Sequence, residues 1–261
     1  MTPIPVVRSL ELHCEGPVLL SPADALPLTA PSDGRVHAWY APLDRLDPFR
    51  SAWVEHLDPN ERDRAERFRF ARDRRRFELA HGLLRTILGH YLGRPPRSLA
   101  FERGPHGKPA LTTGGLEFNL SDTKDAVLVG ISSGQAIGAD IETSDREVDH
   151  LAVGDHYFVP DEMEAIRAAG EGSKERFLLY WTRKEAILKA SGVGIMEDLR
   201  SLRVDLPFHS ARITHPEFMR MAAPGYHVMS LQASPTHLIS LAMPGPIQCV
   251  GQKPRLAVSR P

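Results

Sequence analysis

The feature that most constrains the fold of this chain is an internal echo between two stretches of sequence. The segment LDPNE at 57–61 resembles FVPDE at 158–162, and FELAHGLLRTIL at 77–88 resembles FLLYWTRKEAIL at 177–188. Two unrelated amphipathic helices could produce the second similarity by chance, but both echoes fall in the same order. They predict two similar halves related by a pseudo-twofold axis. Because ligands often bind at such interfaces, we expect a ligand cleft between the halves.

The periodicity of the apolar residues predicts a mixed α+β fold. Helices are expected over about 72–92 and 160–190. Strands are expected at 35–43, 116–120, 125–132, 136–142, 199–206, 225–233 and 236–242. We therefore divide the chain into an extended lead-in over 1–35, an N-terminal half over 36–134, a C-terminal half over 135–243 and a loose tail over 244–261.

Composition excludes several classes of protein. The chain has 261 residues, 42% hydrophobic and 25% charged, which is enough for a sizeable core and excludes disorder of the whole chain. No apolar run approaches the length of a membrane span, and the N-terminus does not have the pattern of a secretory signal, so we expect a soluble cytoplasmic protein. Cys14 and Cys249 lie near opposite ends and support neither a disulfide framework nor a thiolate metal site.

Charge is balanced overall but uneven locally. The formal net charge is −1, so no global field draws the protein to nucleic acid or to a membrane. The segment 61–76 nevertheless holds eight arginines against four acids. This segment fits a solvated helix face, a contribution of one or two arginines to phosphate binding, or a nucleic-acid-binding surface, and the interleaved acids weaken the last interpretation.

The first candidate group for chemistry is the pair of carboxylates in GADIE. In a strand, alternation places Asp140 and Glu142 on one face, about 7 Å apart at Cα, while Ile137, Ala139 and Ile141 point the other way. Two such carboxylates repel each other unless a cation lies between them. Hard oxygen ligands of this kind suit Mg²⁺, although a strand end with solvated acids is the ordinary alternative.

The second candidate group lies in WTRKEAILKA at 181–190. Helical spacing makes Glu185 and Lys189 neighbours on one face, beside a stripe of Phe177, Trp181 and Leu188. Taken alone, the pair fits an ordinary surface ion pair. Brought to the two strand carboxylates, Glu185 would complete an acidic cation site, and Lys189 would meet phosphate or developing negative charge.

The third candidate group is the loop RGPHGKP at 103–109, followed by FNLSD at 118–122. Gly104 and Gly107 allow a ligand to approach the backbone closely, while Arg103 and Lys108 supply positive charge. The pattern is not a Walker phosphate loop, and a plain turn between strands is the alternative.

In this order, the segments resemble the Sfp-type 4'-phosphopantetheinyl transferases. The resemblance covers about 57–206 and includes PNERDRAERFRFARD, RGPHGKP, FNLSD, IGADIE, FVPDE and WTRKEAILKASGVGI. It implies two similar α+β halves with coenzyme A bound between them. It also implies an enzyme that moves the 4'-phosphopantetheine arm of coenzyme A to a serine of an apo acyl- or peptidyl-carrier protein.

The resemblance also implies roles for individual residues. Asp140, Glu142 and Glu185 would be the Mg²⁺ ligands in the C-terminal half, Glu185 would also be the base for the carrier serine, and Lys189 would steady the leaving phosphate. The positions that would contact the nucleotide end of coenzyme A are Arg64, Arg103, Gly104, Pro105, His106, Gly107, Lys108, Asn119, Leu120, Ser121 and Asp122.

One of these positions departs from the family pattern. The family commonly has His where this chain has Asp122, and an aspartate there would repel the 3'-phosphate of coenzyme A. Either Arg64, Arg103 and Lys108 compensate, or Asp122 turns away and Ser121 carries the contact. Weakened affinity for coenzyme A is the resulting hypothesis.

Three alternative functions also fit parts of the sequence. They are a Mg²⁺-dependent nucleotidyl transferase or phosphohydrolase using the same carboxylates, a nucleic-acid-binding module using residues 61–76, and a relative that binds without catalysing. The sequence leaves the carrier protein open among the carriers of fatty-acid, polyketide, nonribosomal-peptide and lysine pathways. Because one chain would supply both sides of the cleft, a monomer would be sufficient.

Overall fold

The computed structural model describes residues 30–31, 36–193, 199–205, 208–209 and 226–244. Cys14, Cys249 and nearly all of the expected lead-in and tail lie outside these residues. The elements up to Ser132 are β1 (Val36–Pro42), α1 (Leu43–Leu46), η2 (Asp47–Phe49), α2 (Arg50–Val54), α3 (Pro59–Glu66), α4 (Ala71–Leu92), η3 (Pro96–Ser98), β2 (Phe101–Arg103), β3 (Pro109–Leu111), β4 (Glu117–Asp122) and β5 (Ala126–Ser132). Those that follow are β6 (Gly138–Thr143), α5 (His150–Tyr157), α6 (Pro160–Ala168), η4 (Gly170–Gly172), α7 (Ser173–Ser191), η5 (Leu199–Ser201), β7 (Phe208–His209), β8 (Tyr226–Gln232) and β9 (His237–Met243).

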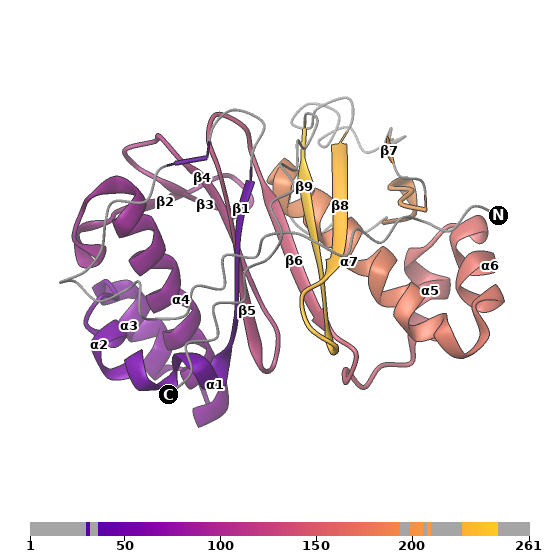
Figure 1. The fold of residues 1–261 in the computed structure, drawn as a ribbon, viewed down its shortest axis with the longest axis horizontal. Helices are drawn as coiled ribbons and strands as arrows, with labels where there is room; N and C mark the ends of the chain where they lie inside the picture. Colours follow the sequence, from indigo (N-terminus) through magenta and orange to yellow (C-terminus); the bar gives the residue numbers. More distant parts are fainter. Residues whose placement is uncertain (1–29, 32–35, 194–198, 206–207, 210–225, 245–261) are drawn as a thin grey trace.

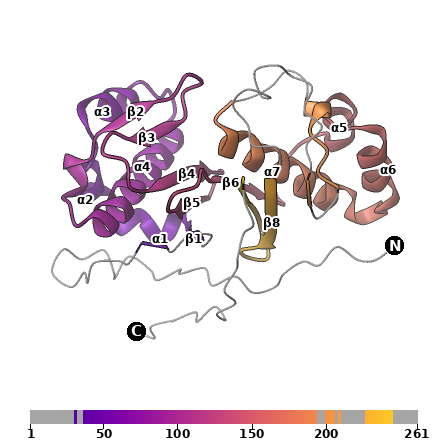
Figure 2. The same cartoon turned by 90° about the horizontal axis from the view of Figure 1, so that it is seen from above.

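The strands form two antiparallel sheets that lie between two groups of helices. The first sheet has the order β1-β5-β4 and the second has the order β6-β9-β8-β7, while β2 and β3 form a separate hairpin. Figure 1 shows helices α1–α4 outside the first sheet and α5–α7 outside the second, and the two parts also lie side by side in Figure 2. The expectation of a mixed α+β fold is confirmed.

Strand alternation explains the layers. Residues of one parity from both sheets form a shared central core, in which the first sheet contributes Ala38, Tyr40, Ala126 and Leu128 and the second contributes Ala139, Ile141, Leu231, Ile239 and Leu241. Residues of the other parity pack outward against helices, as Val127, Val129 and Ile131 of β5 do. Both faces of β5 are therefore covered, which is why every residue of this strand is apolar or small.

A close approach of α7 to β6 fixes the position of the second sheet. A Cβ atom on Gly138 would lie 1.8 Å from the carbonyl oxygen of Ala186 and 2.4 Å from the backbone nitrogen of Ala190. Only a residue without a side chain permits this contact between helix and strand. The approach brings Lys189 of α7 to the start of β6.

The two echoed segments make similar local structures. In α3, Asp58 and Glu61 form a capping box, with the Glu61 N–H 2.9 Å from Asp58 Oδ1, and Glu61 also accepts from the buried Arg85 at 2.5 Å. In α6, Glu162 accepts from the Val159 N–H and pairs with the buried Lys184 at 2.8 Å. Each long helix therefore places a fully buried cation against the glutamate that begins the preceding helix.

The expected strand over 199–206 is wrong. Residues 199–201 form a short 3-10 helix, and no strand runs through 199–205. The physical reason is the buried Lys184, whose Nζ donates to the carbonyl oxygens of Leu199 at 2.9 Å and Leu202 at 2.6 Å. These carbonyl groups point to a side chain and cannot form a strand ladder. Helix α5 and the β2–β3 hairpin were not predicted, and the turn of that hairpin is the loop 104–108.

Within the described ranges, no helix combines the length and the apolar character needed to cross a bilayer.

The packing at Gly138 yields a stability prediction. Gly138→Ala should lower the free energy of unfolding by about 3 kcal/mol, because the added methyl group collides with backbone atoms of α7 that cannot rotate away. Urea denaturation measures the change. Gly172→Ala is the matched control, since its Cβ would meet only Ala169 Cβ at 4.0 Å, and the two variants should differ clearly. Equal stability of both variants would contradict this packing.

Candidate active site

The candidate site lies where the edge strands of the two sheets meet. Strand β4 ends the first sheet and β6 ends the second, and these two edges are in contact. The side-chain oxygen of Asn119 in β4 accepts from the backbone N–H of Ala139 in β6 at 2.8 Å. This buried bond satisfies an edge N–H group that has no strand neighbour on that side. It also sets β4 beside the carboxylates of GADIE.

Three polar side chains meet at this junction. Lys189 Nζ donates to Asp140 Oδ1 at 2.5 Å and to Ser121 Oγ at 3.0 Å, and Ser121 Oγ lies 3.0 Å from the same carboxylate oxygen. Burial acts to lower the pKa of Lys189, but the carboxylates of Asp140, Glu185 and Asp122 together outweigh burial and raise this pKa. Lys189 is therefore a firmly charged ammonium group, held by one residue of each half.

The other two predicted acids lie in the same electrostatic environment. Burial, followed by repulsion from Asp140, raises the pKa of Glu142 to about 7. Burial and then Asp140 also raise the pKa of Glu185. As the alternation predicts, Ala139 and Ile141 enter the central core, so Asp140 and Glu142 point to the opposite side of β6.

The donor set fits a divalent cation in one specific respect. Asp140 Oδ2 is buried and has no hydrogen-bond partner among the described residues, although a buried carboxylate oxygen normally has one. Carboxylate oxygens are also the ligands that Mg²⁺ prefers. In the part of the chain that the structure describes, however, no three acids or histidines already converge as a cluster that could hold an ion. The orphaned oxygen could therefore serve as one ligand of a cation, and the other acids would have to turn toward it.

Glu142 is engaged by an arginine that the sequence analysis did not single out. Arg146 forms an ion pair with Glu142 Oε1, and its guanidinium carbon lies 5.7 Å from the centre of the Trp181 ring. The signal available in the sequence was the run DIETSDR, in which an arginine follows the acid by four positions.

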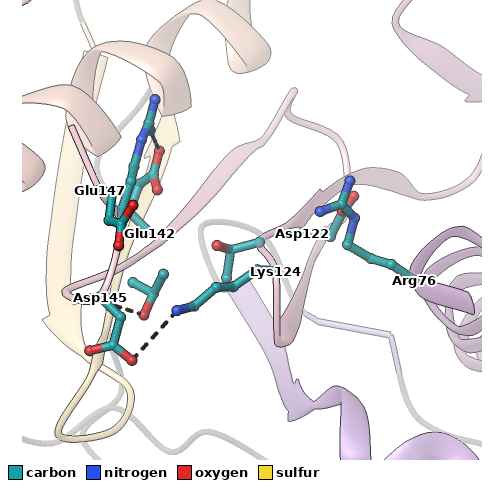
Figure 3. A pocket seen from close by; sticks show the side chains of 9 residues that line it. Arg76, Asp122, Lys124, Glu142, Asp145 and Glu147 are labelled. Atoms are coloured by element: carbon teal, nitrogen blue, oxygen red, sulfur yellow. Dashed lines mark hydrogen bonds and ion pairs between the residues drawn. The ribbon is translucent and has the colours of Figure 1, made fainter. Parts of the chain in front are cut away.

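A polar cavity of about 520 Å³ opens beside this group and extends to the first half. Its lining consists of Arg76, Asp122, Thr123, Lys124, Glu142, Thr143, Asp145, Arg146 and Glu147. Figure 3 shows Glu142, Glu147 and Asp145 on one side and Asp122 with Arg76 on the other. Lys124 lies between the two sides and points to Asp145. The cavity is therefore bounded by both halves and by charges of both signs.

Asp122, the departure from the family pattern, has a cationic partner. Its Oδ2 lies 2.9 Å from Nε of Arg76 on α4. Burial raises the pKa of Asp122, while the nearby cations Arg76, His81, Lys189 and Arg64 oppose that change. The sequence analysis did not single out Arg76, although it lies at the end of the arginine-rich segment.

The family resemblance implies that several residues contact the nucleotide end of coenzyme A. In this structure some of these residues instead form hydrogen bonds to other groups of the protein. Lys108 Nζ donates to the carbonyl oxygens of Ile137 at 3.0 Å and Ala190 at 3.2 Å, so it joins the two halves. Arg103 donates to the Gly107 carbonyl at 2.9 Å, within its own turn. The other assigned residues of the loop are Gly104, Pro105 and His106, which lie in the same turn, and Leu120 packs beside the core of the first half.

Four of the eight arginines in the segment 61–76 form ion pairs within the chain. The pairs are Arg62 with Glu55, Arg74 with Glu78, Arg75 with Asp44 and Asp47, and Arg76 with Asp73 and Asp122. Arg64 lies 5.1 Å from the centre of the Phe77 ring. This pattern does not resemble a surface that neutralises a nucleic-acid backbone.

Comparisons with known proteins agree with this arrangement. A family model described as the 4'-phosphopantetheinyl transferase superfamily matches residues 136–230, and a second, described as the N-terminal part of 4'-phosphopantetheinyl transferase, matches residues 46–133. Together the two models cover both halves, including β4 and β6.

Relatives support the same family. The 4'-phosphopantetheinyl transferase HetI of Nostoc sp. is 34% identical over 224 residues, which are 84% of this chain and 91% of the relative. The 4'-phosphopantetheinyl transferase psf-1 of Bacillus pumilus is 33% identical over 63% of this chain and 71% of its own length. The human L-aminoadipate-semialdehyde dehydrogenase-phosphopantetheinyl transferase is 27% identical over 61% of this chain and 57% of its own length. The chain therefore belongs to the 4'-phosphopantetheinyl transferase superfamily and is a transferase.

The contacts of Lys108 predict a structural effect. Lys108→Met should lower the free energy of unfolding by about 2 kcal/mol, because two carbonyl oxygens of the buried residues Ile137 and Ala190 lose their donor. Urea denaturation tests this against Lys124→Met, which removes the same charge from a side chain that is 53% exposed. If both variants unfold at the same urea concentration as the unmodified protein, Lys108 does not join the halves.

Proposed function

We propose that this transferase moves the 4'-phosphopantetheine arm of coenzyme A to a serine of an apo acyl- or peptidyl-carrier protein, with adenosine 3',5'-bisphosphate as the second product. The observation that carries the proposal is the junction of Ser121, Asp140 and Lys189, where one charged lysine and one orphaned carboxylate oxygen meet beside a cavity bounded by both halves. The names of the relatives support the chemistry.

Coenzyme A would lie between the halves 36–134 and 135–243, whose similar capping glutamates and buried cations support a pseudo-twofold relation. One chain supplies both sides of such a cleft, so the proposal requires only a monomer. The cationic groups that face the cavity from the first half, Arg76 and Lys124, are suited to the phosphate groups of the nucleotide.

The metal of this proposal is Mg²⁺, and Asp140, Glu142 and Glu185 are the residues that would hold it. When bound, it would neutralise negative charge on the pyrophosphate of coenzyme A. The buried oxygen of Asp140 without a partner among the described residues supports this assignment, and so does the crowding of the three acids, since burial and then repulsion from Asp140 raise the pKa of Glu142 and of Glu185.

Residues of the chain would act on both the attacking serine and the departing adenosine bisphosphate. A serine hydroxyl is a weak nucleophile at neutral pH and needs a base. Glu185, whose pKa is raised by burial, would accept the serine proton as the serine oxygen bonds to the β-phosphorus. The bond from that phosphorus to the adenosine bisphosphate then breaks. Lys189, fixed by Asp140 and Ser121, would face the negative charge that develops on the departing phosphate.

Intact-mass spectrometry of purified apo carrier proteins tests the transfer. Incubation with the enzyme, coenzyme A and Mg²⁺ should add about 340 Da, the formula mass of a phosphopantetheine arm, to the carrier serine. Glu185→Ala should abolish the gain, since the serine then loses its base. No gain on any of several carriers with coenzyme A bound to the folded enzyme would contradict the proposed function.

Asp122 gives a second test, directed at the 3'-phosphate. Asp122→His should lower the KM for coenzyme A by about tenfold, because a negative charge facing the phosphate is replaced by a group that can donate a hydrogen bond. Asp122→Asn, which only removes the charge, should have a smaller effect of the same sign. Dephospho-coenzyme A lacks the 3'-phosphate and is the control, so its KM should not change. A KM for coenzyme A that does not fall would refute the repulsion.

A further inference from the structure

The acidic group at the junction carries its own counter-charges. Three carboxylates, Asp140, Glu142 and Glu185, face two cations, Lys189 and Arg146. Each cation is paired directly with a different strand carboxylate, while Glu185 feels both at a longer distance. The negative charges of Asp140 and Glu142 are therefore each paired with a positive charge of the chain.

The two cations differ in how firmly they are held. Lys189 donates to two side chains, and its own side chain is 29% exposed. Arg146 is 37% exposed, lies in the turn that follows β6, and lines the cavity. Apart from Glu142, the Trp181 ring is the one recorded contact of its guanidinium within the described part of the chain. A planar guanidinium that stacks on an aromatic ring can move away from its carboxylate and still keep its contact with the ring. It is then neither fully desolvated nor without a partner.

Trp181 connects this arginine to the rest of the acidic group. It lies on α7 one helical turn before Glu185, so Arg146 reaches from the end of β6 to the helix that carries the third carboxylate. The electrostatic influence of Arg146 on both Glu142 and Glu185 agrees with this position. Any cation that binds these two glutamates must therefore compete with Arg146.

We propose that Arg146 is a built-in counter-cation that occupies Glu142 in the absence of metal and thereby sets the affinity of the acidic group for a divalent ion. The inference rests on the metal ligands of the proposed function and adds to it a residue that is not itself a ligand. Arg146 acts through Glu142, so it is a positioning residue. Its ion pair must open before Glu142 can turn toward the free oxygen of Asp140.

Direct metal binding tests this inference without turnover. Mn²⁺ is a suitable probe because carboxylate sites for Mg²⁺ also accept it, and the electron paramagnetic resonance signal of free Mn²⁺ reports binding to the enzyme without substrates. Arg146→Gln should lower the Kd for Mn²⁺ by about tenfold, since one competing positive charge is removed from the group. Arg146→Lys, which keeps the charge, should bind Mn²⁺ nearly as weakly as the unmodified protein.

Two further variants separate this mechanism from a general effect of charge. Lys124→Gln removes one positive charge from the same cavity, but Lys124 pairs with Asp145 at 3.6 Å, so its Kd for Mn²⁺ should change much less. In a Glu142→Gln background, Arg146→Gln should lower the Kd much less, because only the longer-range influence of Arg146 on Glu185 is then removed. An unchanged Kd in Arg146→Gln, or an equal gain in Lys124→Gln, would overturn the inference.

The outcomes also distinguish the inference from the proposed function. Mn²⁺ binding that Asp140→Asn abolishes, but that Arg146→Gln leaves unchanged, would overturn the inference and leave the metal ligands in place. No Mn²⁺ binding in any variant would overturn both the inference and the assignment of the metal. Phosphopantetheine transfer to a carrier would then still be decided by the mass measurement.

Discussion

The hydrogen bond from the Ala139 N–H to the side chain of Asn119 is the contact on which the rest of the site depends. It joins the edge strands of the two sheets directly, and it sets the relative height of β4 and β6. At that height Ser121 lies opposite Asp140, and Lys189 can reach both. A site assembled in this way exists only while both halves are folded and in contact.

Charge in this protein is buried in pairs, and the pairs serve two purposes. Arg85 and Lys184 are fully buried against the capping glutamates of α3 and α6, so each long helix is tied to the start of a shorter helix before it. Lys189 pairs with Asp140 at the junction of the two sheets, and Arg146 pairs with Glu142 in the lining of the cavity. Ion pairs of the same kind are therefore fully buried within each half and partly exposed at the junction.

Much of this arrangement follows from local sequence patterns, and the rest depends on contacts across the chain. Alternation in GADIE correctly placed Ile141 in the core and Asp140 away from it, because strand period is a local property. The strand expected over 199–206 failed because its carbonyl groups bind Lys184, a partner that periodicity cannot reveal. Arg76 was overlooked for a similar reason, since only the folded chain brings α4 to the end of β4.

The position of the metal in a crystal of the protein grown with coenzyme A and Mn²⁺ tests the proposed site most directly. Anomalous scattering locates Mn²⁺ without assumptions about the chemistry. If Asp140 is a metal ligand and coenzyme A binds between the halves, a single strong peak should lie within bonding distance of Asp140 Oδ2, with coenzyme A crossing from the first half to the second. A peak remote from Asp140, or coenzyme A bound to one half alone, would contradict it.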